Sequence, residues 1–203
     1  MKKFLVFCCL LLILMPVSVS AAAPSPTEQL KPALEVLVAI LEDETLKGDD
    51  KRTLRRDKIM AEVNKGFDFN EMSKRILGRT WRKIGDTERK SFIAAMTELL
   101  ENVYLEKLES YTGGGIDFVG ETVKKDRAQV TTIVKGSELT LPVHYILRLQ
   151  GDKWMVYDIN IEGVSLVKNY HGQFKSILRK DGFEGVMKVL DEKNRAFAES
   201  KKE

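Results

Sequence analysis

The sequence predicts an α+β domain in which a curved antiparallel sheet of about four strands is wrapped by N-terminal and C-terminal helices. Apolar residues recur at helical spacing before residue 112 and again after residue 163. Between these regions, residues 116–161 alternate apolar and polar side chains and are divided by turn-forming pairs. Because helices and strands occupy separate parts of the chain, an antiparallel sheet is expected rather than a parallel one.

The first 21 residues have the features of a secretory signal peptide. Lys2 and Lys3 precede an uncharged apolar run that is too short to span a bilayer well, and small residues follow it. We expect cleavage after Ala21, which leaves residues 22–203 as one mature domain. The alternative is an uncleaved N-terminal anchor.

The composition of the mature chain excludes several functional classes. Both cysteines, Cys8 and Cys9, lie in the signal segment, so no thiol remains for a disulfide, a nucleophile or a thiolate metal site. Two of the 33 basic residues are also removed, so 31 face 30 acidic residues, and a net charge of +1 does not suggest a nucleic-acid binder. The basic residues of segment 51–58 are interrupted by Asp57 and are interpreted as a solvated helix face, with a phosphate site as the alternative.

Three helices are expected in the first eighty residues. The first is indicated by the helical spacing of Leu30, Leu34, Leu37 and Leu41. Pro32 predicts that its regular part begins near Lys31 or bends there. A second helix is expected over 51–64, and a short third one has Asn70 as its N-cap and ends at Gly78.

The longest predicted helix begins with Asp86 as its N-cap and continues to about Tyr111. Its apolar set is wider than the stripe of a surface helix and comprises Phe92, Ile93, Met96, Leu99, Leu100, Val103, Tyr104 and Leu108. Two interpretations stay open at this point. Either this is a central helix packed on two sides, or one of its sides lines a ligand cavity.

A four-stranded meander follows, with turns at Lys125-Asp126, Gly136-Ser137 and Gly151-Asp152. The third strand, from Leu139 to Leu149, has one apolar face and spans about 36 Å at about 3.3 Å per residue. A curved sheet of that length can shelter an acyl chain. Pro142 favours an edge position or a bulge. Two further helices are expected over 164–180 and 183–199.

The sequence lacks the usual signs of catalysis, and we expect no metal and no cofactor. His144 and His171 belong to no metal-ligand pattern, and both are interpreted as ordinary surface or partly buried residues. The glycines of 113–115 are not followed by the Lys-Ser/Thr of a phosphate loop, so they indicate a turn. Asp68 is expected to cap or brace a helix entry rather than to transfer protons.

Three segments resemble the MlaC family, also called toluene-tolerance auxiliary proteins. These segments are Phe67-Asp68-Phe69, Leu77-Gly78-Arg79-Thr80-Trp81 and Trp154-Met155-Val156-Tyr157-Asp158-Ile159-Asn160-Ile161-Glu162-Gly163-Val164-Ser165-Leu166-Val167-Lys168-Asn169-Tyr170. The match runs in order from the first helix to about Lys193. One departure is His171-Gly172, where the family commonly has Arg after the Tyr, so a basic contact is not carried over to that position.

This resemblance implies a nuclear-transport-factor-like fold and a periplasmic phospholipid carrier in a Gram-negative envelope. Such a carrier shuttles lipid between the outer and inner membranes and maintains outer-membrane lipid asymmetry. The implied partners are the phospholipid ligand, an inner-membrane ABC transporter with an MCE-domain subunit, and an outer-membrane lipoprotein-porin complex. We expect a monomer, because no coiled-coil seam is present.

The candidate lipid-binding residues come from the apolar sheet face and the helices expected to cover it. They are Leu100, Tyr104, Val130, Tyr145, Leu147, Trp154, Val156, Val164, Leu166 and Phe174. Tyr157, Asp158 and Glu162 are expected to fix the junction between sheet and helix, where Gly163 permits a turn. The alternatives are an enzyme on the same cone-shaped fold, with Asp158 or His144 as a buried base, and a protein-only adaptor with a solid core.

Overall fold

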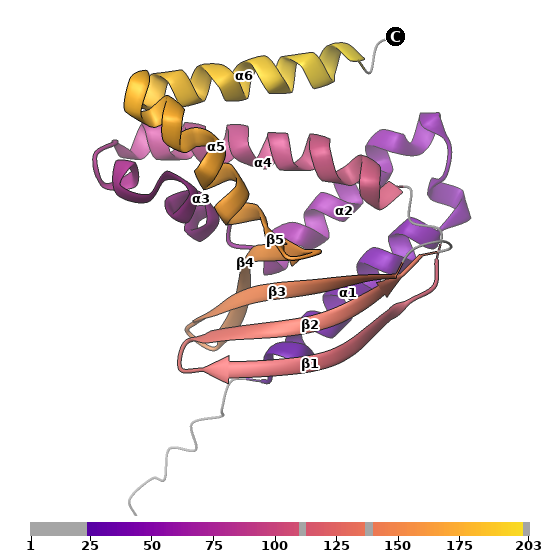
Figure 1. The fold of residues 1–203 in the computed structure, drawn as a ribbon. Helices are drawn as coiled ribbons and strands as arrows, with labels where there is room; N and C mark the ends of the chain where they lie inside the picture. The colour runs from indigo at the N-terminus through magenta and orange to yellow at the C-terminus, as the bar shows by residue number, and fades with distance from the viewer. Residues whose placement is uncertain (1–23, 110–112, 137–139, 201–203) are drawn as a thin grey trace, which may run out of the picture.

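Helices from both ends of the chain lie against one side of an antiparallel sheet in the computed structural model, which describes residues 24–109, 113–136 and 140–200 (Figure 1). The α-helices are α1 (Pro26–Glu42), α2 (Arg52–Gly66), α3 (Phe69–Leu77), α4 (Asp86–Glu109), α5 (Leu166–Lys180) and α6 (Gly182–Ser200). Short 3-10 helices are η1 (Glu44–Leu46), η2 (Asp49–Lys51) and η3 (Gly78–Arg82). The strands are β1 (Ile116–Lys124), β2 (Arg127–Lys135), β3 (Thr140–Gln150), β4 (Lys153–Ile161) and β5 (Val164–Ser165).

The strands form a meander in the order β1-β2-β3-β4-β5, and every neighbouring pair is antiparallel. The predicted α+β class is therefore confirmed. β5 is a short addition, because Glu162 and Gly163 both have positive φ angles, of 51° and 83°, and reverse the chain. Ser165 then caps α5 by accepting a hydrogen bond from the Lys168 amide, so this helix begins at Leu166 rather than at Val164.

The helix starts differ from expectation where a local capping group decides them. α1 begins at Pro26 because Ser25 and Glu28 form a capping box, and Pro32 lies inside the helix. α3 is capped by Asp68, which accepts a hydrogen bond from the Glu71 amide at 2.8 Å, and not by Asn70. The capping role expected of Asp68 is thus confirmed.

The predicted longest helix is α4, which already includes Asp86 as a helical residue. The Gly85 amide before it donates a hydrogen bond to Glu88 at 2.7 Å. The expected end of this helix at Tyr111 and the expected start of the third strand at Leu139 lie outside the described residues. Among the residues described, no helix is both long and apolar enough to cross a membrane.

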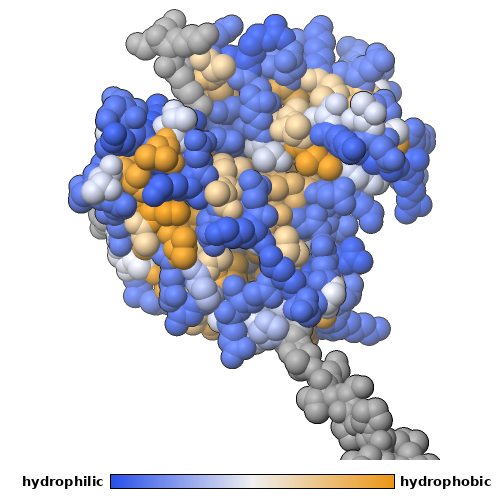
Figure 2. Space-filling model, turned by 180° about the vertical axis from the view of Figure 1, so that it is seen from behind, coloured by the Kyte–Doolittle hydropathy of each residue, from blue (hydrophilic) through white to orange (hydrophobic). Residues whose placement is uncertain are grey.

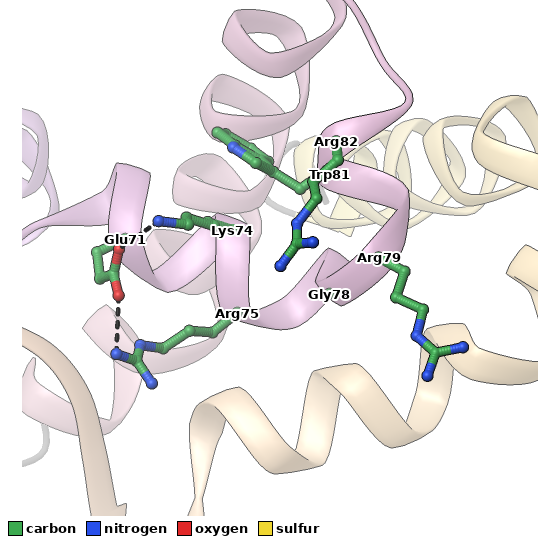
Figure 3. Close-up of a pocket in the computed structure, with 7 residues that line it drawn as sticks. All are labelled: Glu71, Lys74, Arg75, Gly78, Arg79, Trp81 and Arg82. Atoms are coloured by element: carbon green, nitrogen blue, oxygen red, sulfur yellow. Dashed lines mark ion pairs between the residues drawn. The ribbon is translucent and has the colours of Figure 1, made fainter.

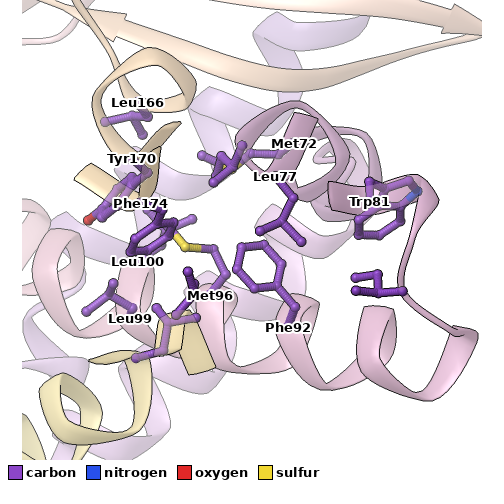
Figure 4. Close-up of a cluster of buried hydrophobic side chains, with 14 residues drawn as sticks. Met72, Leu77, Trp81, Phe92, Met96, Leu99, Leu100, Leu166, Tyr170 and Phe174 are labelled. Atoms are coloured by element: carbon purple, nitrogen blue, oxygen red, sulfur yellow. The ribbon is translucent and has the colours of Figure 1, made fainter. Parts of the chain in front are cut away.

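Buried apolar side chains form two separate clusters. The helical cluster joins α3, η3, α4, α5 and α6 and consists of Met72, Ile76, Leu77, Trp81, Ile84, Phe92, Met96, Leu99, Leu100, Leu166, Tyr170, Phe174, Val186 and Leu190 (Figure 4). The sheet cluster joins α1 to the inner face of the sheet and consists of Leu30, Leu34, Ala128, Val130, Val143, Tyr145, Leu147, Trp154 and Val156. Phe67 and Ile159 pack against both clusters.

α4 is a central helix, as one of the two interpretations of its sequence held. It packs against α6 and α3, and Phe92, Met96 and Leu99 are each no more than 1% exposed. Val103 and Tyr104, one turn further on, are only partly buried. The helix therefore contributes buried side chains to the core as far as Leu105 and also presents apolar side chains that are not fully covered.

Candidate ligand site

The strand register arranges the inward-facing side chains of the sheet in rows that cross β2, β3 and β4. These rows are Ala128-Leu147-Val156, Val130-Tyr145-Ile159, Thr132-Val143-Ile161 and Val134-Leu141. All but one of the side chains in these rows are apolar. The inner face is therefore a continuous apolar surface along the full length of β3.

The cover over this apolar surface decreases from one end to the other. Ala128, Leu147 and Val156 are buried, and the docked N-terminal part of α1 explains this. Gln29 of α1 exchanges two hydrogen bonds with the backbone of Trp154, at 2.8 and 2.9 Å. At the other end, the rows finish in side chains that are only partly buried, namely Val134, Leu141, Ile159 and Ile161.

Residues of α4 and α5 form a second apolar wall. Val103, Tyr104 and Val167 pack on the helical cluster and are partly buried, and Ile159 of the sheet packs on the same cluster. Within the described residues, α4 packs on α3 and α6 and has no extensive contact with the sheet. In the view from behind, apolar residues gather in the middle of one face and hydrophilic residues surround them (Figure 2).

Tyrosines supply the polar groups that lie within these apolar walls. Burial raises the pKa of the Tyr145 phenol to about 12, although its hydrogen bond with Thr132 acts in the opposite direction. Burial and the neighbouring Tyr104 raise the pKa of Tyr170 to about 12, and burial also raises the pKa of Tyr104. These phenols are neutral at physiological pH, so they make the interior polar in places without charging it.

Tyr145 is expected to make the folded protein less stable at high pH. Its pKa is higher in the folded state than its ordinary value of 10.0, so its contribution to stability is complete below pH 10 and is lost as the pH rises through about 12. We expect this group to remove about 2–3 kcal/mol from the free energy of unfolding over that range. Denaturant unfolding at several pH values should show a shallower decline for Tyr145→Phe, and equal declines for the two proteins would contradict the assignment.

The structure places eight of the ten predicted site residues in the two clusters. Val130, Tyr145, Leu147, Trp154 and Val156 belong to the sheet cluster, and Leu100, Leu166 and Phe174 belong to the helical cluster. Tyr104 lies at the margin of the helical cluster. Val164 is 55% exposed in β5.

Coverage separates the predicted residues into packed and accessible ones. Val130, Leu147 and Phe174 are at most 1% exposed, so protein atoms already surround them. Trp154 has a structural role as well, because its indole N–H donates to the Pro24 carbonyl at 3.1 Å. Sequence reasoning did not name several partly buried apolar residues as site candidates, and these are Phe67, Val103, Val134, Leu141, Ile159, Ile161 and Val167. Of these, Phe67 and Ile159 pack on both clusters. The strand alternation contained a signal for Val134, Leu141, Ile159 and Ile161.

The polar residues considered for catalysis have structural partners instead. One carboxylate oxygen of Asp158 accepts a hydrogen bond from the Ser165 hydroxyl at 2.6 Å, and the other accepts from the Val167 amide at 3.0 Å. Asp158 therefore fixes the junction between β4 and α5, as expected. His144 lies 3.0 Å from the Thr131 hydroxyl on the outer face of the sheet. The described part of the chain contains no group of His, Cys, Asp or Glu side chains that could hold a metal ion.

Taken together, fold and site define an α+β binding protein whose interior offers two apolar walls. Residues 32–192 match the family model described as MlaC protein, so the chain belongs to the MlaC family. This confirms the resemblance seen in the three sequence segments, and it confirms a binding protein rather than an enzyme.

Two similar proteins are informative. The chain is 22% identical over 147 residues to the intermembrane phospholipid transport system binding protein MlaC of Haemophilus influenzae, which covers 70% of this chain and 67% of that protein. A solved structure of a phospholipid-binding protein from Ralstonia solanacearum, in complex with a phospholipid, has a TM-score of 0.76 and 23% identity. That match covers 88% of this chain and 99% of the other, and it supports the same fold.

Proposed function

We propose that the protein is a periplasmic phospholipid carrier that shuttles lipid between the outer and inner membranes and so maintains outer-membrane lipid asymmetry. The observation that carries this proposal is the apolar inner face of the sheet, which continues past its packed end to side chains that are only partly buried. Membership of the MlaC family supports the same function, as does the phospholipid bound by the structural relative from Ralstonia solanacearum.

The proposed lipid site lies between the two apolar walls. The acyl tails of the lipid would contact partly buried residues of both walls, which are Phe67, Val103, Tyr104, Val134, Leu141, Ile159, Ile161 and Val167. Leu100, Tyr145, Trp154, Val156 and Leu166 are buried, and Val130, Leu147 and Phe174 are at most 1% exposed, so these eight residues would be core neighbours of the site. Val164 is left out of the proposed site, because it is exposed in β5.

The energetics of transfer favour apolar walls without strong head-group clamps. Removing one methylene from water is worth about 0.8 kcal/mol, so two acyl chains gain tens of kcal/mol relative to water. A bilayer offers nearly the same gain. The net driving force therefore comes from differences of a few kcal/mol between donor, carrier and acceptor, and a tight clamp would slow release.

Export and partners are part of the same proposal. Residues 1–21 would direct the chain to the periplasm and be removed, so the mature protein would begin at Ala22. There it would act as a monomer with an inner-membrane ABC transporter carrying an MCE-domain subunit and with an outer-membrane lipoprotein-porin complex.

The purified protein is expected to carry diacyl phospholipid without any added ligand, because an empty apolar space large enough for two acyl chains would be costly or would collapse. Native mass spectrometry, followed by organic extraction and lipid analysis, measures the bound lipid. Folded protein that repeatedly contains no lipid would count against the carrier and in favour of the adaptor with a solid core.

A further inference from the structure

A second hollow lies on the helical side of the molecule, at α3 and η3. This pocket has a volume of about 410 Å³, and four cationic side chains line it, Lys74, Arg75, Arg79 and Arg82 (Figure 3). One acidic residue, Glu71, also reaches it. The pocket is therefore strongly basic and differs in character from the apolar walls of the proposed lipid site.

The single carboxylate of Glu71 does not neutralise the whole pocket, because three cations already share this carboxylate. Its carboxylate lies 2.8 Å from Arg75, 3.5 Å from Lys74 and 3.4 Å from Arg148. Arg79 and Arg82 are exposed and form no ion pair with any residue that the structure describes. The Arg82 guanidinium points into the middle of the pocket, whereas the Arg79 guanidinium extends away from the Glu71 carboxylate (Figure 3).

The neighbouring helix α5 enlarges this basic surface. α3 packs against α5, and the His171 ring of α5 donates a hydrogen bond from Nδ1 to the Ile76 carbonyl at 2.8 Å. α5 contains no Asp or Glu, whereas its exposed side chains include Lys168, Lys175 and Arg179. Residues 74–83 together with the exposed side of α5 are called the basic face below.

We propose that the basic face docks an acidic segment of a protein partner, with carboxylates entering the pocket beside Arg79 and Arg82. This inference rests on the proposed function, because a carrier must bind its membrane-bound partners and leave them again. Guanidinium groups present planar pairs of donors that match carboxylates. Docking by exposed charges also gives fast association that weakens with salt, which suits a short encounter.

A protein segment fits this surface better than a lipid bilayer does. The pocket is concave, and it accommodates inserted side chains. Membrane-surface binding usually adds apolar side chains that enter the interface. The large apolar residues that are strongly exposed in the described chain, Val36, Leu54, Val119, Val123 and Val164, lie on α1, α2, β1 and β5 instead.

The test compares two charge reversals of equal size in the full-length mature protein. The docking variant is Arg79→Glu with Arg82→Glu, and the control variant is Lys188→Glu with Lys193→Glu on the exposed side of α6. The probe is a fluorescent synthetic peptide of alternating glutamate and alanine residues, titrated at low salt. The docking variant is expected to bind it about tenfold more weakly than wild type, and the control variant about as well as wild type.

Three results would overturn this inference. The wild-type protein does not bind the peptide at low salt; both variants lose affinity equally, which would indicate net charge alone; or the docking variant loses binding to phosphatidylglycerol vesicles while its peptide affinity is unchanged, which would indicate a membrane surface. Lipid content is measured on the same samples and is expected to be equal in all three proteins. Lipid-free wild-type protein would contradict the carrier function, whereas the peptide comparison would still decide the docking.

Discussion

Replacing Ile159 with tryptophan is expected to remove most of the bound phospholipid while the protein still folds with a similar melting temperature. Ile159 is partly buried and packs against both clusters, so a larger side chain there can extend into the space between the two apolar walls. Tryptophan adds apolar volume without burying a charge, which separates filling a ligand space from damaging the core. Lipid extracted per mole of protein measures the loss.

Leu147→Trp is the matched control, because Leu147 is in the same sheet but is only 1% exposed. No free space surrounds this side chain, so the larger ring should lower the free energy of unfolding by about 1–3 kcal/mol through overpacking. If the Ile159 variant folds and keeps its full lipid load, the space between the clusters is not the lipid site. If the Leu147 variant instead loses lipid without losing stability, the site lies deeper under the sheet.

Glu71→Ala is expected to lower the free energy of unfolding by about 3 kcal/mol. The Glu71 side chain is only 9% exposed and lies within 3.5 Å of Lys74, Arg75 and Arg148. Removing it leaves three cations close together, and Arg75 also stacks 4.1 Å above the Tyr157 ring, which limits its movement into solvent. Urea unfolding of the variant and of the wild type measures the difference.

Glu98→Ala serves as the control for this variant, because Glu98 is an exposed residue in α4 and the same change there removes only a solvated charge. We expect an effect within about 0.5 kcal/mol for the control. Equal stabilities for the two variants would mean that the three cations around Glu71 reach solvent without cost. High salt is not expected to restore the full stability of the Glu71 variant. Part of the repulsion among the remaining cations acts between partly buried groups, which salt screens poorly.

Local sequence signals predicted most of the fold, and the misses are at capping groups. The turn pairs Lys125-Asp126 and Gly151-Asp152 separate strands in the structure as expected, because a hairpin needs such residues at its own position. α1 begins at Pro26, upstream of the expected start or bend near Lys31, because the Ser25 capping box starts the helix before Pro32. α5 begins two residues after the expected start at Val164, because the Glu162-Gly163 reversal allows a short strand first.

The proposed lipid site could be predicted only in outline. Alternation along β3 and β4 identified the inward-facing residues, because side chains of a strand point to opposite faces in turn. It did not distinguish Leu147, which is fully covered, from Ile159, which is not. Coverage depends on which helix packs above each residue, and α1 docks over one end of the sheet through Gln29 and Trp154.

The sequence alone therefore determined the α+β class, the meander and the family, since all of these follow from local periodicity, turn residues and contiguous motifs. Only the tertiary structure decided that α4 packs on both α3 and α6, where the apolar sheet face is left partly uncovered, and that η3 and α5 form one basic face. These features join residues distant in the chain, such as Ile76 and His171. Burial and electrostatic neutralisation are properties of such contacts, and no local pattern encodes them.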